Sequence, residues 1–275
     1  MSKFSVVSSV YRNDKPEFVR RALDSITVLQ SRRPDEVVLV VDGPVPDELS
    51  VMLDDYQKSS PVEFNIIRLP ENKGLGNALK IGVEAAKYEI IARMDSDDVS
   101  VPDRFEKQIG FMERHPDFDV VGGQISEFID TEENIVGKRI VPCGNEEISM
   151  WLKGRCPFNH VSVSFLRSRG LAVGNYQDWH FNEDYYLWIR MAQAGYKFAN
   201  LPDVLVNVRV GRDMYARRGG WKYFKSEAML QRYMLDNQII NRGGYLVNTL
   251  KRLIVQVLLP NSVRAWVFKR FAREH

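Results

Sequence analysis

The sequence has only two cysteines, Cys143 and Cys156, in 275 residues. Two cysteines cannot form a disulfide framework, and the lack of a CxxC pair argues against a zinc or redox site built on cysteine. No run of about 18 apolar residues occurs, so no transmembrane helix is predicted. The amino-terminal apolar run is also too short for a signal peptide. We therefore expect a cytoplasmic protein whose membrane contact is limited to its surface.

A net charge of one sign is missing too, since 38 basic and 36 acidic side chains give a formal net charge of +2. The two signs are nevertheless unevenly distributed. Residues 1–208 carry 24 basic and 32 acidic side chains (net −8), whereas residues 209–275 carry 14 and 4 (net +10). A content of 44% hydrophobic and 27% charged residues is typical of a globular protein. The sequence thus predicts an acidic folded body followed by a basic tail.

Strand and helix patterns alternate along the first part of the chain. Strands are predicted at Phe4–Val10, Glu36–Val41, Glu63–Arg68 and Glu89–Met94, and helices at 16–30, 74–87 and 104–114. This alternation indicates parallel βαβ units. Residues 117–142 have a less regular β pattern, 182–195 are helical, 196–208 form a strand, and the chain beyond 212 is mostly helical. We predict an α/β domain over 1–211, with a mainly parallel sheet flanked by helices, and a basic amphipathic helical extension over 212–275.

Polar clusters follow three of the predicted strands. They are Tyr11–Asp14, Asp42 and Asp95–Asp98. In open α/β sheets, ligands bind in the crevice beyond the carboxyl ends of the strands. The convergence of three polar clusters there predicts a ligand site at this edge of the sheet.

The cluster Asp95-Ser96-Asp97-Asp98 allows two interpretations. Carboxylates on one tight turn can bind a hard cation, and Mg²⁺ or Mn²⁺ typically takes one or two carboxylates together with substrate phosphates. Alternatively, Asp98 or Asp103 caps the helix that follows. The carboxylate of Asp42, at the end of another strand, favours the metal site.

The segment Asn182-Glu183-Asp184 opens a helix, so capping and interaction with the helix dipole are the default interpretation. A second interpretation is catalytic, because a carboxylate held in a cleft can remove the proton from an attacking hydroxyl. His160 is a lone histidine, which is more often structural than catalytic. Gly74-Leu75-Gly76 is not a dinucleotide fingerprint, because Leu79 takes the place of the third glycine, although glycines at a helix start still suit a phosphate or sugar.

Five motifs, in this order, resemble those of family 2 glycosyltransferases. They are Ser9-Val10-Tyr11, Val40-Val41-Asp42-Gly43, Asn72-Lys73-Gly74, Asp95-Ser96-Asp97-Asp98 and Glu183-Asp184-Tyr185-Tyr186-Leu187-Trp188. The resemblance covers about residues 3–210 and is greatest to the bacterial branch that builds exopolysaccharide, capsule or O-antigen units, such as the amylovoran biosynthesis type. It implies a GT-A fold, a nucleotide-sugar donor, a divalent cation and inversion at the anomeric carbon.

The resemblance also implies residue roles. Asp184 would be the catalytic base with Glu183 beside it, and Asp95 and Asp97 would bind Mg²⁺ or Mn²⁺. An acceptor or sugar pocket would contain Asn159, His160 and Trp188. The nucleotide-sugar site would contain Ser9, Val10, Tyr11, Asn13, Glu17, Asp42, Asn72, Gly74, Lys80, Arg93, Asp95, Ser96, Asp97, Arg212, Arg217 and Arg218. The expected donor is a UDP-sugar, and the expected acceptor is a hydroxyl of a saccharide carried on a polyprenyl diphosphate.

Two positions depart from the family pattern. Many relatives carry an arginine in the helix after the Asn-x-Gly motif, where this chain has Leu79, so Lys80 or Arg93 would supply that charge. Many also end the domain with Arg-x-His, and here Gly211 stands at the histidine position. Metal ligation would then rest on the carboxylate turn, the diphosphate and water. Stabilisation of the diphosphate would come from Arg212, Arg217 and Arg218.

The basic tail is rich in aromatic side chains. Residues 245–259 are richly apolar around Lys251-Arg252, and farther on Trp266, Phe268 and Phe271 alternate with Lys269, Arg270 and Arg273, so that membrane contact would involve residues 245–275. A basic, aromatic amphipathic helix suits an anionic membrane surface, on the inner face of the cell membrane. Alternatively, its apolar face packs on the domain. Nucleic-acid binding is not expected, because the body is acidic and no binding motif is found.

Two other functions fit less well. A sugar-phosphate nucleotidyltransferase has a related α/β layout and uses Mg²⁺, but it needs a glycine-rich basic loop after the first strand, and Ser8–Asp14 contains no glycine. A catalytically silent relative that acts as a binding subunit is the other alternative. The complete set of Asp42, Asp95, Asp97 and Asp184 speaks against it.

Overall fold

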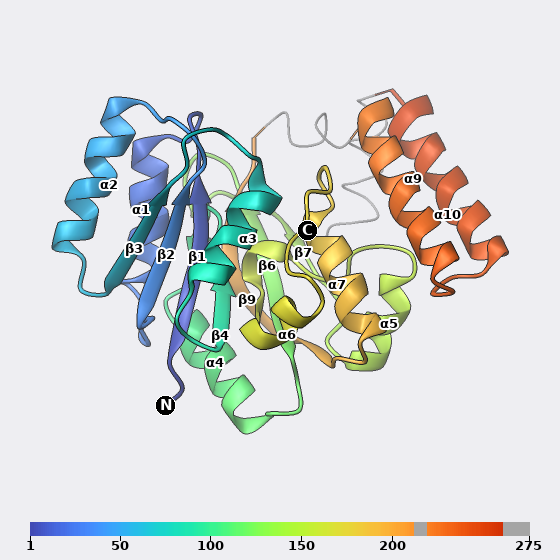
Figure 1. The fold of residues 1–275 in the computed structure, drawn as a ribbon, viewed down its shortest axis with the longest axis horizontal. Helices are drawn as coiled ribbons and strands as arrows, with labels where there is room; N and C mark the ends of the chain where they lie inside the picture. The colour runs from blue at the N-terminus through green and yellow to red at the C-terminus, as the bar shows by residue number, and fades with distance from the viewer. Residues whose placement is uncertain (212–218, 261–275) are drawn as a thin grey trace.

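The fold was examined in a computed structural model that describes residues 1–211 and 219–260. A central sheet is covered by helices on both faces, and a helical hairpin lies at one end (Figure 1). Over the described ranges, no helix is long and apolar enough to cross a membrane.

The first strands and helices alternate as the sequence predicts. They are β1 (Phe4–Val10), α1 (Pro16–Ile26), β2 (Glu36–Val41), α2 (Asp47–Ser59), β3 (Glu63–Arg68), α3 (Leu75–Ala85) and β4 (Ile90–Arg93). Every residue of β2 is buried, as its β-branched run requires of a strand with both faces covered. The predicted bounds of β1, β2 and β3 are confirmed.

The second half adds shorter strands and helices. They are β5 (Val99–Ser100), α4 (Arg104–Arg114), β6 (Val120–Phe128), β7 (Ile135–Arg139), α5 (Asn145–Leu152), η1 (His160–Ser162), β8 (Ser164–Leu166), α6 (Arg167–Ala172), α7 (Glu183–Gln193) and β9 (Phe198–Arg209). The hairpin consists of α9 (Trp221–Asp236) and α10 (Arg242–Leu253), and α10 continues as the π-helical η2 (Ile254–Leu258). The predicted helices and strands of this half are thus confirmed in outline.

The strands of the described residues form one mixed sheet in the order β3-β2-β1-β4-β8-β6-β9-β5, with β7 paired to β6. The four strands β3, β2, β1 and β4 are parallel, which confirms the predicted βαβ units. Strand β8 is antiparallel to both β4 and β6, whereas β6 and β9 are parallel. The carboxyl ends of β1 and β2 therefore lie at one edge of the molecule, the upper edge in Figure 1.

Helix α1 is shorter than predicted, since it ends at Ile26 instead of Gln30. The Thr27 hydroxyl donates to the carbonyl of Leu23 (2.7 Å), and the Gln30 amide donates to the carbonyls of Ser25 and Val101 (both 2.7 Å). These side chains satisfy carbonyls that a longer helix would have used, so the chain turns away instead.

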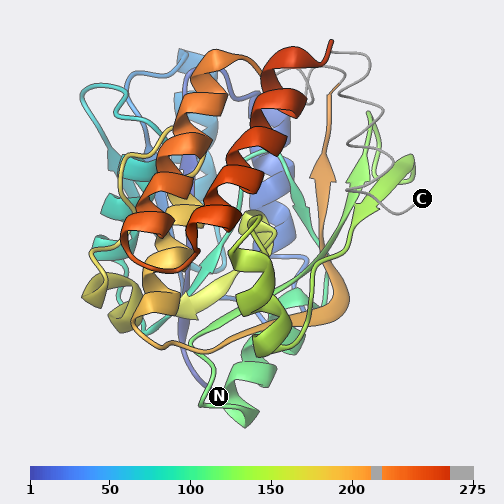
Figure 2. The same cartoon turned by 90° about the vertical axis from the view of Figure 1, so that its right-hand side faces the viewer.

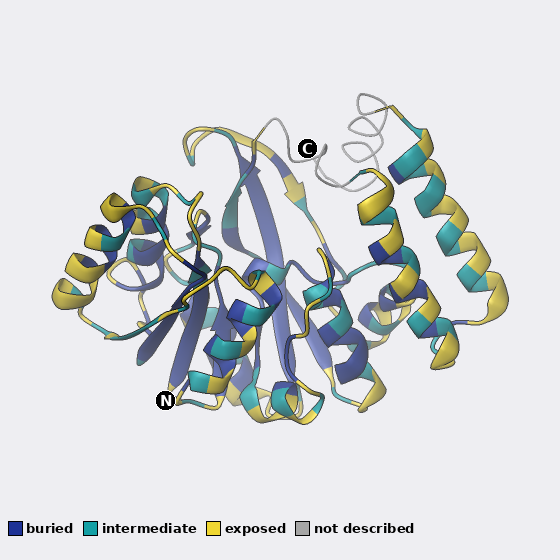
Figure 3. Cartoon of the chain, turned by 45° about the horizontal axis from the view of Figure 1, so that its top comes forward, coloured by how far each residue is buried: buried dark blue, intermediate teal, exposed yellow. Residues whose placement is uncertain are grey.

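Two apolar clusters fill the interior on the two faces of the sheet. The hairpin belongs to the second cluster through α9, where Leu230 and Met234 are fully buried. Helix α10 has no buried residue. The predicted extension is therefore partly core and partly surface (Figure 3), while the domain boundary at residue 212 remains a prediction.

Candidate active site

Asp42, at the end of β2, forms hydrogen bonds that hold the loop leading into α3. Its carboxylate accepts hydrogen bonds from the backbone N–H groups of Lys73 (2.7 Å) and Gly74 (2.9 Å), and its carbonyl accepts one from the Asn72 amide (3.0 Å). These contacts bring together three predicted nucleotide-site residues, Asp42, Asn72 and Gly74. Because Asp42 is also 95% buried (5% exposed), its first role is to shape this loop.

The carboxylate turn Asp95–Asp98 follows β4 at the same edge. Asp95 forms an ion pair with Arg93, whose side chain is buried (2% exposed). Asp98 is buried and accepts a hydrogen bond from the backbone N–H of Arg209 (2.8 Å). Asp103 makes no capping hydrogen bond to α4. The capping interpretation of this cluster is therefore not supported, and Asp95 and Asp97 remain available to a ligand.

Asp14 is a functional candidate that the predicted site residues do not include. Its carboxylate accepts hydrogen bonds from the Tyr11 backbone (3.0 Å) and from the Ser96 hydroxyl (2.9 Å), so it joins the turn after β1 to the turn after β4. Burial raises its pKa, with Asp95 as a further cause. The signal was present in the sequence, because Asp14 belongs to the polar cluster after the first strand.

Mutual repulsion marks this group of carboxylates. The pKa of Asp97 is raised to about 6, first by shielding of its carboxyl group from water and then by the charges of Asp95 and Asp14. The Asp97 side chain is itself exposed to solvent, so the charges of its neighbours act on it partly through water. Burial together with Asp95 and Asp97 also raises the pKa of Asp98. Carboxylates held this close are stabilised by a cation.

A divalent cation fits this donor set only with help from the substrate. No group of three or more His, Cys, Asp or Glu side chains arranged to hold a metal ion is found among the residues that the structure describes. The hard oxygen donors of Asp95 and Asp97 suit Mg²⁺ or Mn²⁺, which commonly keep only one or two carboxylates and complete their shell with phosphate oxygens and water. A cation bound here would therefore need further oxygen donors from a bound substrate and water.

Glu183 and Asp184 open α7 at the same edge of the sheet (Figure 1). Burial, and then the charge of Asp184, raises the pKa of Glu183 to about 7. Burial also raises the pKa of Asp184, but the Tyr185 backbone and the guanidinium groups of Arg139 and Arg93 oppose that shift. The Cys156 sulfur lies 3.8 Å from Asp184 Oδ2. Asp184 is thus the carboxylate that the surrounding cations favour in its ionised form.

Arg93 connects the two carboxylate groups. Besides forming an ion pair with Asp95, Arg93 opposes through its positive charge the rise in the pKa values of Asp97, Glu183 and Asp184. Its buried Nε atom has no hydrogen-bond partner among the described residues. Of the two cations predicted to supply the missing charge, Arg93 is thus the buried one that pairs with Asp95, whereas Lys80 is exposed on α3.

Gly76 allows the first turn of α3 to approach α7. A Cβ atom at this position would lie 2.9 Å from the carbonyl oxygen of Gln177 and 3.2 Å from Glu183 Cβ. Gly76 is one of the two glycines of the Gly74-Leu75-Gly76 segment, and its lack of a side chain lets α3 pack against Gln177 and Glu183. The spacing of glycines in the sequence did not predict this contact.

Replacing Gly76 by alanine is expected to displace the carboxylates of α7. The added methyl meets backbone at 2.9 Å, which cannot move as a flexible side chain can. Such overpacking destabilises a protein by about 1–3 kcal/mol. We expect thermal denaturation to show this loss, and a reaction that depends on these carboxylates to slow about tenfold or more, since small displacements of reacting groups are costly. Gly144→Ala, with open space at its Cβ, is the matched control; equal behaviour of the two variants would contradict the expectation.

The three residues predicted for an acceptor or sugar pocket are mostly structural. Asn159 is buried, donates to the Gly123 carbonyl (2.9 Å) and accepts from Arg139 (2.9 Å). His160 Nε2 lies 2.9 Å from the Tyr176 hydroxyl, and burial lowers its pKa well below the usual value, so it is neutral. Trp188 is fully buried in the second apolar cluster. It therefore presents no surface to a sugar, which removes the support for that predicted role.

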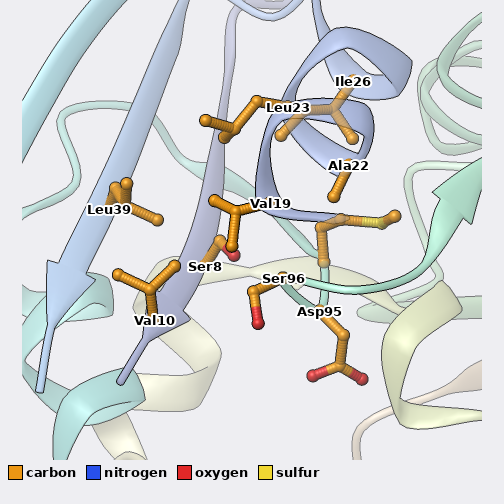
Figure 4. Close-up of a pocket in the computed structure, with 10 residues that line it drawn as sticks. Ser8, Val10, Val19, Ala22, Leu23, Ile26, Leu39, Asp95 and Ser96 are labelled. Atoms are coloured by element: carbon orange, nitrogen blue, oxygen red, sulfur yellow. The ribbon is translucent and has the colours of Figure 1, made fainter. Parts of the chain in front are cut away.

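The remaining predicted residues surround the site at different depths. Ser9 is partly buried and Val10 is buried, whereas Tyr11, Asn13 and Glu17 are exposed. A narrow pocket beneath them lies between α1 and the sheet, with apolar walls and with Asp95 and Ser96 at its edge (Figure 4). It is too tight to hold a water molecule, so it is a packing gap below the site. Arg212, Arg217 and Arg218 lie outside the described residues.

Arg209 holds the end of β9 against the carboxylate turn. Its guanidinium carbon lies 3.9 Å from the ring centre of Phe18 and 4.6 Å from that of Phe128. Its Nε donates to the carbonyl of Asp97 (3.2 Å). The arginine of the Arg-x-His position is thus present and engaged, while Gly211 supplies no ligand. These contacts of Arg209 were not predictable from the sequence, because they join segments that are far apart in the chain.

Comparisons with known proteins agree with this geometry. Residues 5–173 match the profile of "Glycosyl transferase family 2", and residues 90–265 match that of "Glycosyl transferase family group 2". An uncharacterized glycosyltransferase of Haemophilus influenzae is 40% identical over 99% of this chain and 100% of its own length. The amylovoran biosynthesis glycosyltransferase AmsE of Erwinia amylovora is 38% identical over 97% of this chain and 98% of its own length. The Escherichia coli UDP-Gal:alpha-D-GlcNAc-diphosphoundecaprenol beta-1,3-galactosyltransferase is 33% identical over 98% of this chain and 97% of its own length.

Solved structures share the fold at low sequence identity. S. aureus TarS 1-349 in complex with UDP-GlcNAc superposes with a TM-score of 0.68 at 16% identity, over 92% of this chain and 72% of that one. A mannosyltransferase from Pyrobaculum calidifontis in complex with GDP-Man and Mn²⁺ gives 0.65 at 16% identity, over 100% and 76%. The chain spans 43% of a longer TarS structure. With more than half of its residues matched by the family profile, this chain belongs to glycosyl transferase family 2 and is a glycosyltransferase with the GT-A fold.

Proposed function

We propose that this glycosyltransferase transfers a sugar from a UDP-sugar to a hydroxyl of a lipid-linked saccharide, with inversion at the anomeric carbon. The observation that supports it is buried Arg93, which pairs with Asp95 of the carboxylate turn and whose charge also acts on Glu183 and Asp184. A diphosphate bound at the carboxylate turn would then hold the sugar in front of Asp184. Attack from the opposite side of the sugar gives inversion.

In the proposed reaction, the acceptor oxygen forms a bond to the anomeric carbon as the bond to UDP breaks. The acceptor proton passes to Asp184, whose pKa burial raises while the charges of Arg139 and Arg93 oppose that shift. Asp95 and Asp97 would hold Mg²⁺ or Mn²⁺ together with diphosphate oxygens, and the bound cation neutralises charge on the departing UDP. Arg93 pairs with Asp95, and its positive charge reduces the repulsion among the carboxylates of the two groups.

The donor and acceptor classes are supported by the relatives. The E. coli relative is named for UDP-Gal and a diphosphoundecaprenol-linked acceptor, and TarS was solved with UDP-GlcNAc. Since one relative is named for amylovoran biosynthesis and another for O-antigen biosynthesis, we propose that the acceptor is a growing cell-surface polysaccharide unit on a polyprenyl diphosphate. The enzyme would work in the cytoplasm, at the inner face of the cell membrane.

A panel of UDP-, GDP- and dTDP-sugars tests the proposal. We expect the full-length protein to bind and release only the uridine nucleotide, and EDTA to lower transfer at least about tenfold, as loss of a charge-neutralising cation should. Calorimetry measures binding, and released nucleotide measures turnover. Binding of no donor would contradict the proposed function, binding of GDP-sugars alone would contradict UDP, and full transfer in EDTA would contradict the role of the metal.

A further inference from the structure

Helix α10 and its continuation η2 present an apolar stripe to the outside of the protein. The stripe consists of Leu246, Leu250, Ile254 and Leu258, which recur every four residues and therefore share one side of the helix. Their exposed fractions are 66%, 52%, 41% and 63%. A helix that buried its apolar side on the domain would show the opposite pattern. We call these four residues the outer stripe.

Polar contacts, on the other side of the helix, attach α10 to the protein. The Asn248 amide donates to Gln231 of α9 (2.9 Å) and to the Lys153 carbonyl (2.9 Å). Arg252 pairs with Glu227 of α9 and donates to the Gly154 carbonyl (2.9 Å). These contacts hold α10 in an orientation that leaves the outer stripe exposed; Figure 2 shows the hairpin at the surface of the protein, and Figure 3 shows exposed residues along it.

The hairpin that carries the outer stripe also carries an excess of cations. The two acidic side chains of the described hairpin, Glu227 and Asp236, are paired with Arg252 and Arg232. Four further cations of the hairpin are exposed and form no ion pair within residues 219–260 or 1–211; they are Lys222, Lys225, Arg242 and Lys251. The described hairpin is therefore positively charged, and residues 209–275 as a whole carry a net charge of +10.

We propose that the outer stripe and the cations of the hairpin bind the protein to an anionic phospholipid surface. Leucine and isoleucine side chains enter the acyl boundary, while lysines extend to phosphate groups. Trp221, 60% exposed at the start of α9, is of the type that lies at the membrane–water interface. A second copy of this chain is disfavoured as the occupant, because it would bring the same positive charges face to face.

The position of the hairpin ties this surface to the candidate active site. The Gly220 N–H donates to the Gln256 carbonyl (2.8 Å), so Trp221 and the end of the stripe lie at the same end of the hairpin. There, Ser226 of α9 bonds to Asn182 (3.1 Å), the residue before Glu183. In Figure 1 this end lies at the edge that carries the site. A lipid-linked acceptor would thus reach the carboxylates of α7 from the docked membrane.

Vesicle binding tests this inference with the full-length protein and without donor or acceptor. We expect sedimentation with vesicles of phosphatidylcholine and phosphatidylglycerol, much weaker sedimentation with phosphatidylcholine alone, and loss of binding as salt rises. Leu246→Gln/Leu250→Gln should weaken binding about tenfold or more, because each leucine contributes buried apolar area. Lys225→Gln/Lys251→Gln should weaken it about fivefold for each lysine removed.

Matched controls carry the same changes on other helices. Val51→Gln/Met150→Gln removes two apolar side chains that are 59% and 63% exposed on α2 and α5, and Lys58→Gln removes an exposed lysine of α2. These variants should bind vesicles as the wild type does. Membrane binding extends the proposed function but is measured independently of it. A protein that binds vesicles but no donor would contradict only the proposed function.

Three results would overturn the inference. The wild type could fail to bind anionic vesicles, or the outer-stripe variant could bind as well as the controls, which would assign binding to residues 261–275. The wild type could also be a dimer that the outer-stripe substitutions convert to a monomer, which would make a second copy the occupant. Circular dichroism of each variant shows that the fold is retained, which is expected because every substituted side chain is exposed.

Discussion

Replacing Asp184 by asparagine is expected to reduce transfer about 10³-fold and to leave donor binding unchanged, since a positioned general base contributes about 10²–10⁴. Asparagine has nearly the same shape as aspartate but cannot accept the acceptor proton. The carboxylate turn that would hold the diphosphate is not altered. Single-turnover transfer gives the rate of the chemical step, and calorimetry with the UDP-sugar gives the donor dissociation constant.

Glu183→Gln is the matched control for this prediction. Glu183 lies in the same turn of α7, one residue earlier, and its pKa of about 7 leaves it only partly ionised at neutral pH. The substitution leaves Asp184 in place, so we expect the rate of transfer to fall about tenfold or less, because Asp184 would be slightly displaced but still able to accept the proton. If Glu183→Gln abolishes transfer while Asp184→Asn retains it, Glu183 is the base.

Much of the fold could be predicted because its signals are local. Strands β1, β2 and β3 are apolar runs that end at charged or turn residues. Helix α2 was not predicted, although Leu49, Met52 and Tyr56 lie on its buried side at helical spacing. Strand β8 has only three residues and inserts antiparallel between β4 and β6. Its place depends on pairing with distant strands, which no local pattern encodes.

The site was predicted as a set of carboxylates but not as a network. Motif order brought Asp95, Asp97 and Asp184 together, because strand ends and helix starts meet at one edge of a parallel sheet. The burial of Arg93 between them depends on the packing of η1 and β8, and the contact of Gly76 with α7 depends on the loop at residue 177. Trp188 was misjudged because an aromatic at helical spacing has the same pattern in a pocket wall and in a core.

Replacing Asp97 by asparagine is expected to change stability and ligand binding in opposite directions. Without a cation, the raised pKa of Asp97, about 6, means that its charged form is disfavoured in the folded protein. The substitution removes that charge, so the metal-free protein should gain up to about 1 kcal/mol at pH 7, a value discounted for the exposure of the residue. Binding of Mn²⁺ with the UDP-sugar should weaken about 100-fold, since a cation ligand is lost.

The pH dependence separates this effect from a general change in the fold. A carboxyl group whose folded pKa lies above its unfolded value binds more protons when folded, so its contribution makes the protein less stable as pH rises from about 4 to 6 and stays constant above. On acidification from pH 7 to 5, the free energy of unfolding of the metal-free wild type should therefore increase relative to that of Asp97→Asn. Differential scanning fluorimetry at several pH values, with and without Mn²⁺ and UDP-sugar, measures both effects.

Asp103→Asn provides the control for both measurements. Asp103 lies just beyond the carboxylate turn, is only half shielded from solvent and pairs with Lys107 (2.8 Å), a surface contact worth little. It should change neither stability nor binding. A gain in stability combined with a loss of ligand binding at Asp97 cannot arise from partial unfolding, because unfolding lowers both. If Asp97→Asn instead destabilises the metal-free protein, Asp97 is a structural residue and the cation is held elsewhere.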